Sequence, residues 1–207
     1  MPTALAKPPI PFRVRLRRQT AIVSRWLHLY LSMVSFAVVL FFAVTGITLN
    51  HADWFAGQVR ETRFKGTLPT EWLKAATPDQ VAMVTKLRAA HGISGTVSDY
   101  RVDSGQVSMS FKGPGYAADA LIDRNTGAYD VVQTKSGWVA VLNDLHKGRD
   151  SGRGWSAVID VSAVLLTLVS LTGLLLLFFV YKRRVSGLIL AAAGGVVCWL
   201  AWVRYVP

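Results

Sequence analysis

Three long apolar runs constrain the fold of this chain more than any other feature. Residues 26–49 contain no Lys, Arg, Asp or Glu, residues 155–181 carry only Asp160, and residues 187–203 carry no charge. About 20 apolar residues are needed to cross a hydrocarbon core of ~30 Å. Hydrophobic residues make up 52% of the whole chain. The runs therefore predict an α-helical integral membrane protein with three transmembrane helices.

Basic residues predict the orientation of these helices. A basic tail, residues 1–25, precedes the first run, and the turn 182–186 contains Lys182, Arg183 and Arg184. Lys and Arg concentrate on the cytoplasmic side of membrane proteins, so both segments are expected there. Residues 50–154 and the C-terminal tail 204–207 then lie outside. The first run ends without a small-residue cleavage site, so we interpret it as an uncleaved anchor in a bacterial inner membrane.

Charge and cysteine content narrow the functional classes. The net charge is +11, and most of it comes from the cytoplasmic flanks, where it favours contact with anionic lipid. No basic face with interleaved aromatic residues occurs, so nucleic acid is not an expected partner. The single Cys198 excludes an intramolecular disulfide and covalent haem attachment through CxxCH. Hydrolase, P-loop and dinucleotide fingerprints are absent, so neither a peptidase nor a nucleotide-using enzyme is expected.

The outer segment has the pattern of a small α+β domain. A helix is expected at 78–91, with Thr77 as N-cap and an apolar stripe of Val81, Val84 and Leu87. Residues 106–112 alternate like a strand that places Val107, Met109 and Phe111 on one face. Strands 120–123 and 128–132 flank the turn 124–127, whose glycine favours a hairpin. The sequence predicts one helix on an antiparallel sheet, inserted between transmembrane helices one and two.

This arrangement resembles a known family. The helix, the strands and the hairpin at 122–127 resemble a PepSY domain, and its insertion between membrane helices resembles the PepSY-associated transmembrane (PepSY-TM) family. Further matches are the segments 25–28 and 145–148 and the dipeptides Thr45-Gly46 and Thr172-Gly173. The resemblance covers most of the chain. It brings in larger relatives that are inner-membrane ferric-siderophore reductases with haem b, although this chain is short and has no histidine in its second or third run.

Two histidines are expected near the outer membrane face. His51 follows the first run, and His146 lies on a short amphipathic helix predicted at 138–147. In the light of the resemblance, both imidazoles are candidate axial ligands of one b-type haem iron. Arg149 and Arg153 are candidate partners of the propionates. Without the resemblance, the residues by themselves favour the alternative, in which both are interfacial polar groups that cap helix ends or bind water.

His28 lies near the opposite membrane face. It precedes His51 by 23 positions, or roughly 35 Å along a straight helix, so one haem cannot contact both. A second haem would need His28 from a symmetry mate, a ligand from another protein, or a ligand other than histidine. The alternative is an interfacial histidine beside Arg25. The small residues 191–195 suit close helix packing within the monomer or in a homodimer.

Each of the remaining polar side chains is expected to make one particular kind of contact. His91 is expected at the C-terminal end of the soluble helix, where it would interact with the helix dipole. Asp160 is expected to pair with Arg149, Arg153 or a protonated histidine. The indole N–H of Trp54 or Trp155 is a further candidate donor to haem propionates.

Two functions follow from this sequence. The first is electron transfer at or across the membrane through haem b, towards ferric iron, a ferric siderophore or a periplasmic redox protein. Such a component of a ferric reductase would need an outside electron donor, because no flavin or nicotinamide fingerprint occurs. The second is a haem-free, membrane-anchored PepSY-like module that binds or regulates an extracytoplasmic protein.

Overall fold

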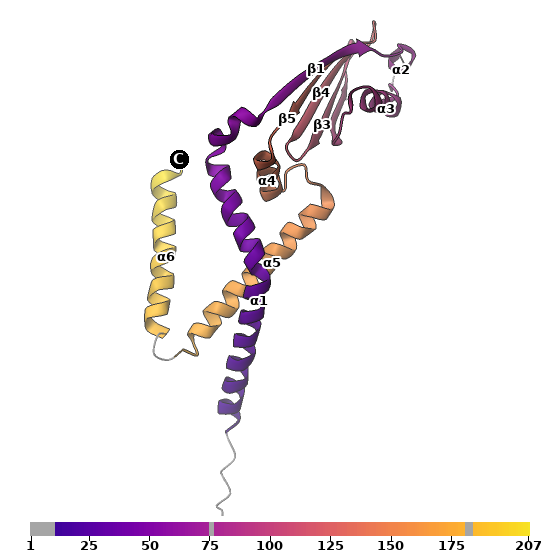
Figure 1. Cartoon of the computed structure of the whole chain (residues 1–207). Coiled ribbons are helices and arrows are strands. Elements are labelled where there is room, and N and C mark those ends of the chain that lie inside the picture. The colour runs from indigo at the N-terminus through magenta and orange to yellow at the C-terminus, as the bar shows by residue number, and fades with distance from the viewer. Residues whose placement is uncertain (1–10, 75–76, 181–183) are drawn as a thin grey trace, which may run out of the picture. The chain divides into compact units, whose positions relative to one another are not determined.

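The computed structural model describes residues 11–74, 77–180 and 184–207 (Figure 1). The chain divides into two compact units. Met1–Val39 and Val161–Pro207 form what we call the helical unit, and Leu40–Asp160 form the sheet unit. Lys182 and Arg183, which the sequence assigns to a cytoplasmic turn, lie outside the described residues.

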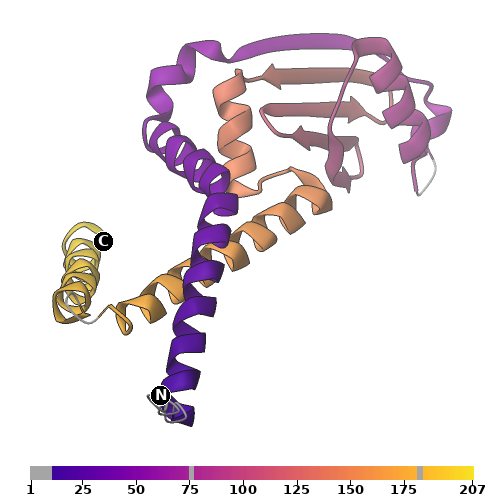
Figure 2. The same cartoon turned by 60° about the horizontal axis from the view of Figure 1, so that its bottom comes forward.

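Three helices are long and apolar enough to cross a membrane. They are α1 (Phe12–Asn50), α5 (Gly152–Leu177) and α6 (Arg184–Tyr205), drawn as long helices in Figures 1 and 2. Each contains most of one predicted apolar run. Helix α1 begins well before its run, inside the basic tail, because Arg is a good helix former and no Pro or Gly interrupts residues 12–25.

Helix α1 buries polar side chains and exposes apolar ones, which is the reverse of the pattern in a soluble helix. Its buried side chains are Ser24, Ser35 and Thr45, whereas Met33, Phe36 and many other apolar residues are exposed. Ser162 is likewise the buried residue of α5. Small hydroxylated residues let membrane helices approach closely, and lipid solvates the outward apolar side chains. The pattern therefore fits helices packed in a bilayer.

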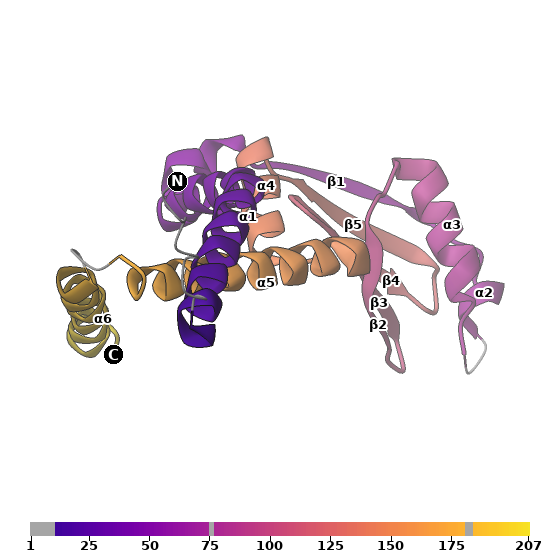
Figure 3. The same cartoon turned by 90° about the horizontal axis from the view of Figure 1, so that it is seen from below.

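The sheet unit contains a five-stranded antiparallel sheet between α1 and α5 in the sequence (Figure 3). The strand order is β1-β5-β4-β3-β2. The predicted strands correspond to β3 (Gln106–Gly113), β4 (Tyr116–Asp123) and β5 (Ala128–Lys135), with the predicted turn between β4 and β5. The sequence patterns missed both edge strands, β1 (Arg60–Thr67) and β2 (Thr96–Val102).

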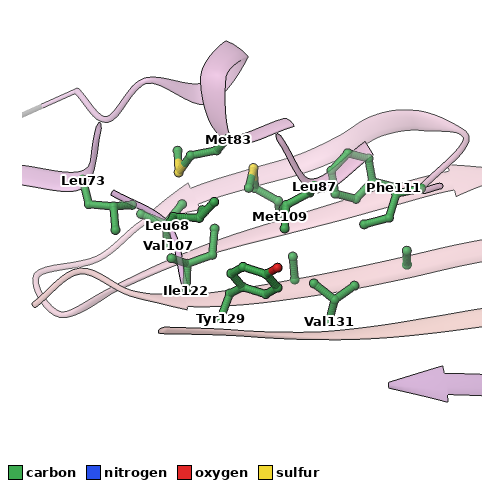
Figure 4. Close-up of a cluster of buried hydrophobic side chains, with 13 residues drawn as sticks. Leu68, Leu73, Met83, Leu87, Val107, Met109, Phe111, Ile122, Tyr129 and Val131 are labelled. Atoms are coloured by element: carbon green, nitrogen blue, oxygen red, sulfur yellow. The ribbon is translucent and has the colours of Figure 1, made fainter. Parts of the chain in front are cut away.

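One face of the sheet packs on α2 (Glu71–Lys74) and α3 (Gln80–His91). Figure 4 shows the resulting core, in which strand side chains meet side chains of these helices. The fully buried members with the largest side chains are Phe111, Leu73, Met83, Leu87, Met109, Ile122, Val107 and Val131. The three core residues predicted on β3 are therefore confirmed.

The predicted face and start of α3 were partly wrong. Val81 is 76% exposed, while Met83 and Leu87 are fully buried and Val84 is partly buried. Val81 precedes Met83 by two residues, which turns it ~200° around the helix and away from the sheet. The N-cap is Asp79 rather than Thr77, because Asp79 Oδ1 accepts the Ala82 N–H at 2.9 Å.

Two short helices lie at one end of the sheet, where Arg60 at the start of β1 pairs with Lys135 at the end of β5. The 3-10 helix η1 (Ala52–Gln58) connects α1 to β1, and α4 (Trp138–Lys147) follows β5. Within the sheet unit α4 contacts η1, and Figure 2 shows α4 beside the part of α1 that precedes η1. Gly148 ends α4 with φ 68°, the left-handed conformation that glycine adopts without strain. These contacts place His146 against α1.

Candidate functional site

His146 is held against α1 by a threonine. Its Nδ1 lies 2.6 Å from Thr45 Oγ1, and its ring meets the Phe42 ring edge-on with centroids 4.9 Å apart. A second polar contact joins the same two helices nearby: Thr48 Oγ1 on α1 donates to Asn143 Oδ1 on α4 at 2.6 Å. Gly46 lies beside the imidazole, where a Cβ would stand at an ordinary contact distance of 3.8 Å from His146 Cε1. Helix α4 is thus fastened to α1 through two polar contacts.

The hydrogen bonds of Thr45 favour the Nδ1–H tautomer of His146. Thr45 Oγ1 donates its one hydrogen to the Phe41 carbonyl at 2.6 Å, so towards His146 it acts as an acceptor. Nδ1 of His146 therefore carries a hydrogen. In the neutral ring the lone pair then resides on Nε2, the nitrogen through which a histidine with this tautomer can bind a metal.

His28 makes an equivalent contact in the helical unit. Its Nδ1 lies 3.1 Å from the Val169 carbonyl and 3.1 Å from Thr172 Oγ1, both on α5. A carbonyl only accepts, so Nδ1 donates and Nε2 again holds the lone pair of the neutral ring. A Cβ at Gly173 would stand 3.0 Å from His28 Cε1, closer than most side chains tolerate. Glycine at this position permits the imidazole to lie against α5.

The two contacts repeat one chemical pattern. In each, a Thr-Gly dipeptide on one helix receives a histidine from another, through Nδ1 and the threonine hydroxyl. Thr172 also donates its hydroxyl hydrogen within its own helix, to the Leu168 carbonyl oxygen at 2.8 Å. The sequence patterns placed both dipeptides in the family resemblance but missed their role as partners of His28 and His146. Thr-Gly late in an apolar run was the available signal.

His51 occupies a different environment from His146. Its ring stacks on Trp54, with centroids 4.1 Å apart and planes 7° from parallel. Across the described part of the sheet unit, the rings of His51 and His146 share no contact. Helices α4 and η1 are in contact, but each imidazole has a different aromatic neighbour.

The side chains predicted to donate hydrogen bonds to haem propionates lie in different environments. Arg149 lines a polar cleft with Lys112, Asp144 and Asp150, next to the C-terminal end of α4. Arg153 is exposed in the first turn of α5. Trp155 is committed elsewhere, because its indole N–H donates to the Leu145 carbonyl at 2.7 Å.

Two further expectations change in the structure. Asp160 is exposed, and over residues 11–74, 77–180 and 184–207 it forms no ion pair with Arg149 or Arg153. His91 does end a helix, yet its Nε2 lies 2.7 Å from the Tyr129 hydroxyl and its ring stacks on Phe64. His91 thus ties α3 to β5 and β1, far along the sequence from the other histidines. Groups of three or more His, Cys, Asp or Glu arranged for a metal are absent from the described residues.

Comparison with known families covers nearly the whole chain. A family model described as PepSY_TM-like matches residues 22–207, which include His28, Thr45, His146 and Thr172. No curated protein and no solved structure matches the sequence. The match thus takes in the helices, the sheet and both histidine–threonine contacts.

Proposed function

Since the chain belongs to the PepSY-TM family, we propose that it is an inner-membrane protein that binds b-type haem and transfers electrons. The observation that carries this proposal is the contact between His146 and Thr45. The threonine holds Nδ1–H of the imidazole and leaves Nε2 as the basic nitrogen. An imidazole in this state is the usual axial ligand of a membrane haem iron, which would supply reversible one-electron chemistry.

The surroundings of His146 also suit such a ligand. The ring is half-buried between α4 and α1 and touches the Phe42 ring, so its orientation is constrained on two sides. Apolar and aromatic neighbours limit water access to a bound macrocycle and affect its potential. Because the hydroxyl of Thr45 is fixed by its own backbone bond, the imidazole would keep this orientation in both oxidation states.

The second axial ligand of this site is proposed to be His51. It lies six residues after Thr45 on the same chain segment, at the start of η1, which contacts α4. Its ring stacks on Trp54, so the indole would lie beside the bound imidazole. Arg149 and Arg153 remain the proposed partners of the propionates, because cationic side chains pair well with carboxylates near a membrane surface.

Orientation follows from the arrangement of charge. We propose that the N-terminal tail is cytoplasmic and that residues 50–154 and the C-terminal tail 204–207 lie outside. A reporter fused at Gly105 tests this, because Gly105 lies in the turn between β2 and β3 and the fusion leaves the first helix intact. Reporter activity typical of the cytoplasm at this position would contradict the proposed orientation.

The absorption spectrum of the detergent-purified protein tests the haem proposal. We expect a low-spin b-type spectrum in protein expressed with added haem precursor. His146→Asn should abolish or shift it, because the amide can replace Nδ1–H towards Thr45 but cannot bind iron through an Nε2 lone pair. His51→Ala should convert the site to a five-coordinate spectrum. His91→Ala is the matched control, because His91 bonds Tyr129 within the sheet unit and is not a proposed haem ligand.

A haem-free binding module is the second candidate function. The face of the sheet opposite α2 and α3 carries partly exposed Ser108, Ser110 and Val132 and exposed Leu121. A cleft of about 270 Å³ lies on this face beside Arg63 and Asp119. Wild-type protein that takes up no haem would contradict the electron-transfer proposal and leave this surface as the candidate site.

A further inference from the structure

We propose that the polar cleft beside the C-terminal end of α4 binds the phosphoethanolamine headgroup of a membrane lipid. The cleft has a volume of about 550 Å³ and lies wholly within the sheet unit. Its walls are the turn between β3 and β4, the end of β5, and the last turn of α4 with the residues that follow it. Ligand clefts commonly have volumes of roughly 300–1,000 Å³. The inference concerns a site separate from the haem ligands and does not depend on haem.

The cleft is lined by charges of both signs that do not pair with one another. Lys112 and Arg149 supply two cations, and Asp144 and Asp150 supply two carboxylates. Within residues 11–74, 77–180 and 184–207, none of these four side chains takes part in an ion pair. Both signs therefore remain for a ligand that itself carries an anionic and a cationic group.

The walls of the cleft are fixed against each other. Asp144 Oδ2 accepts the N–H of Gly115 at 2.8 Å, which ties α4 to the turn between β3 and β4. Gly115 has φ 64°, and a Cβ there would stand 2.5 Å from Val141 Cγ2, so glycine permits this close approach. Oδ1 of Asp144 has no hydrogen-bond partner in the described part of the chain. The carboxylate is thus held in place with one oxygen left for a ligand.

The position of the cleft along the chain indicates that it lies at the level of the lipid headgroups. Asp150 precedes the candidate membrane span α5, which begins at Gly152, by two residues. Trp155 follows in the first turn of α5, and tryptophan is enriched at the membrane–water interface. The indole N–H of Trp155 donates to the carbonyl of Leu145, so α4 and the start of α5 are joined at this level. A lipid headgroup is therefore the phosphate-bearing ligand nearest to the cleft.

Phosphoethanolamine matches both kinds of side chain in the cleft. The guanidinium of Arg149 can donate two parallel hydrogen bonds to phosphate oxygens, and Lys112 adds a second positive charge. The ammonium group donates three hydrogens, which the carboxylates of Asp144 and Asp150 can accept near the negative end of the α4 dipole. Arg149 is also a proposed partner of a haem propionate, and its five N–H donors can serve two anions.

Two other common headgroups lack part of this match. A choline headgroup keeps the positive charge but has no N–H to donate to a carboxylate. A glycerol headgroup keeps the phosphate but has no positive charge. Comparison of the three headgroups therefore separates recognition by this cleft from general attraction of lipid to a basic protein.

Lipid retention by the purified full-length protein tests the site. The protein is placed in nanodiscs that contain equal amounts of phosphatidylethanolamine, phosphatidylcholine and phosphatidylglycerol with the same acyl chains. It is then released into mild detergent, and native mass spectrometry counts the lipids that stay bound. We expect phosphatidylethanolamine to be retained in preference to the other two lipids.

Two variants of the cleft should lose this preference in different ways. Arg149→Gln should lower retention of phosphatidylethanolamine by about tenfold, because the charge-assisted bonds to phosphate are lost. Asp150→Asn should remove the preference over phosphatidylglycerol, because the partner of the ammonium loses its charge. Asparagine suits this position, since Asp150 has φ 53° and asparagine tolerates the left-handed conformation. Near-UV circular dichroism checks that each variant remains folded.

Matched controls and a soluble ligand complete the experiment. Lys147→Gln and Asp160→Asn should retain lipid like the wild type, because both residues are exposed and neither lines the cleft. Equal retention of the three lipids, or equal losses in the cleft variants and these controls, would overturn the inference. Soluble O-phosphoethanolamine should bind more weakly than the lipid, because it lacks the acyl chains that stay in the bilayer. Soluble ligand that binds as tightly as the lipid would overturn a lipid as the occupant.

Discussion

Thr45 Oγ1 lies 2.6 Å from Nδ1 of His146, a residue 101 positions later in the chain. The hydroxyl hydrogen is already directed to the Phe41 carbonyl, so the threonine accepts from the imidazole. Threonine on a helix commonly bonds the preceding turn in this way. Because the Thr45 hydroxyl donates its hydrogen to the preceding turn, its oxygen is left to accept a hydrogen bond from His146.

The first prediction follows from this contact. Thr45→Val keeps the shape of the side chain and removes the acceptor of Nδ1–H, so His146 loses its orienting hydrogen bond. Loss of such a partner costs about tenfold or more in metal affinity. We expect Thr45→Val to weaken haem retention by that factor and to shift the midpoint potential. Thr45→Ser, which restores the hydroxyl, should recover both, as measured by haem titration and redox titration of the purified protein.

A matched variant separates orientation of His146 from packing of α4. Thr48→Val removes the neighbouring bond to Asn143 and leaves His146 and Thr45 untouched. We expect it to loosen α4 without moving the potential. An equal shift in Thr48→Val and Thr45→Val would show that the threonine at 45 only packs the helix.

The helices that carry His28 and His146 were predictable from the sequence, whereas the partners of the two imidazoles were not. His146 lies near the C-terminal end of α4, whose apolar stripe predicts a helix, and His28 lies within α1, near the start of the apolar run that predicts this helix. Thr45 and Thr172 sit inside apolar runs as ordinary small residues. Their contacts join residues 101 and 144 positions apart. Only the packing of helices reveals such a pair.

The missed strands have separate physical reasons. Strand β2 contains a bulge, because the register shifts between Val97 and Asp99. Val97 and Tyr100 both pack on the core although they are three residues apart, so the alternation expected of a strand is broken. Strand β1 is an edge strand whose charged Arg60, Arg63 and Lys65 protect the edge and hide the apolar pattern.

The second prediction concerns the hydrophobic core of the sheet unit. Phe111 is fully buried between β3 and the helices, so Phe111→Ala leaves a large cavity. We expect a loss of about 3–5 kcal/mol in the free energy of unfolding. Val81→Ala is the control, because this exposed side chain should change stability by less than about 0.5 kcal/mol. Urea denaturation of the full chain in detergent, followed by near-UV circular dichroism, measures both.

The third prediction distinguishes two candidate caps of α3. Asp79 accepts the N–H of Ala82, so Asp79→Ala should cost about 1 kcal/mol of stability. Thr77 precedes Asp79 by two residues and is exposed, so Thr77→Ala should have little effect. The same denaturation assay compares them. A larger loss for Thr77→Ala than for Asp79→Ala would restore Thr77 as the cap.

The fourth prediction concerns the turn between β4 and β5. Hydrogen bonds from the backbone N–H groups of Thr126 and Asn125 lower the pKa of Asp123 below its usual range. A carboxylate with a lowered pKa in the folded state stabilises the fold at pH above its unfolded pKa of about 3.9. This contribution is lost as the pH falls through the folded pKa.

Amide hydrogen exchange of the turn measures that loss locally. After correction for intrinsic rates, protection of Asn125 and Thr126 should be constant near neutral pH and should fall in acid below the unfolded pKa of about 3.9. Asp123→Asn retains an oxygen that accepts both N–H groups but cannot ionise, so its protection should not change with pH in this range. A wild-type turn whose protection stays level while the pH falls through this interval would show that the charge of Asp123 does not stabilise the hairpin.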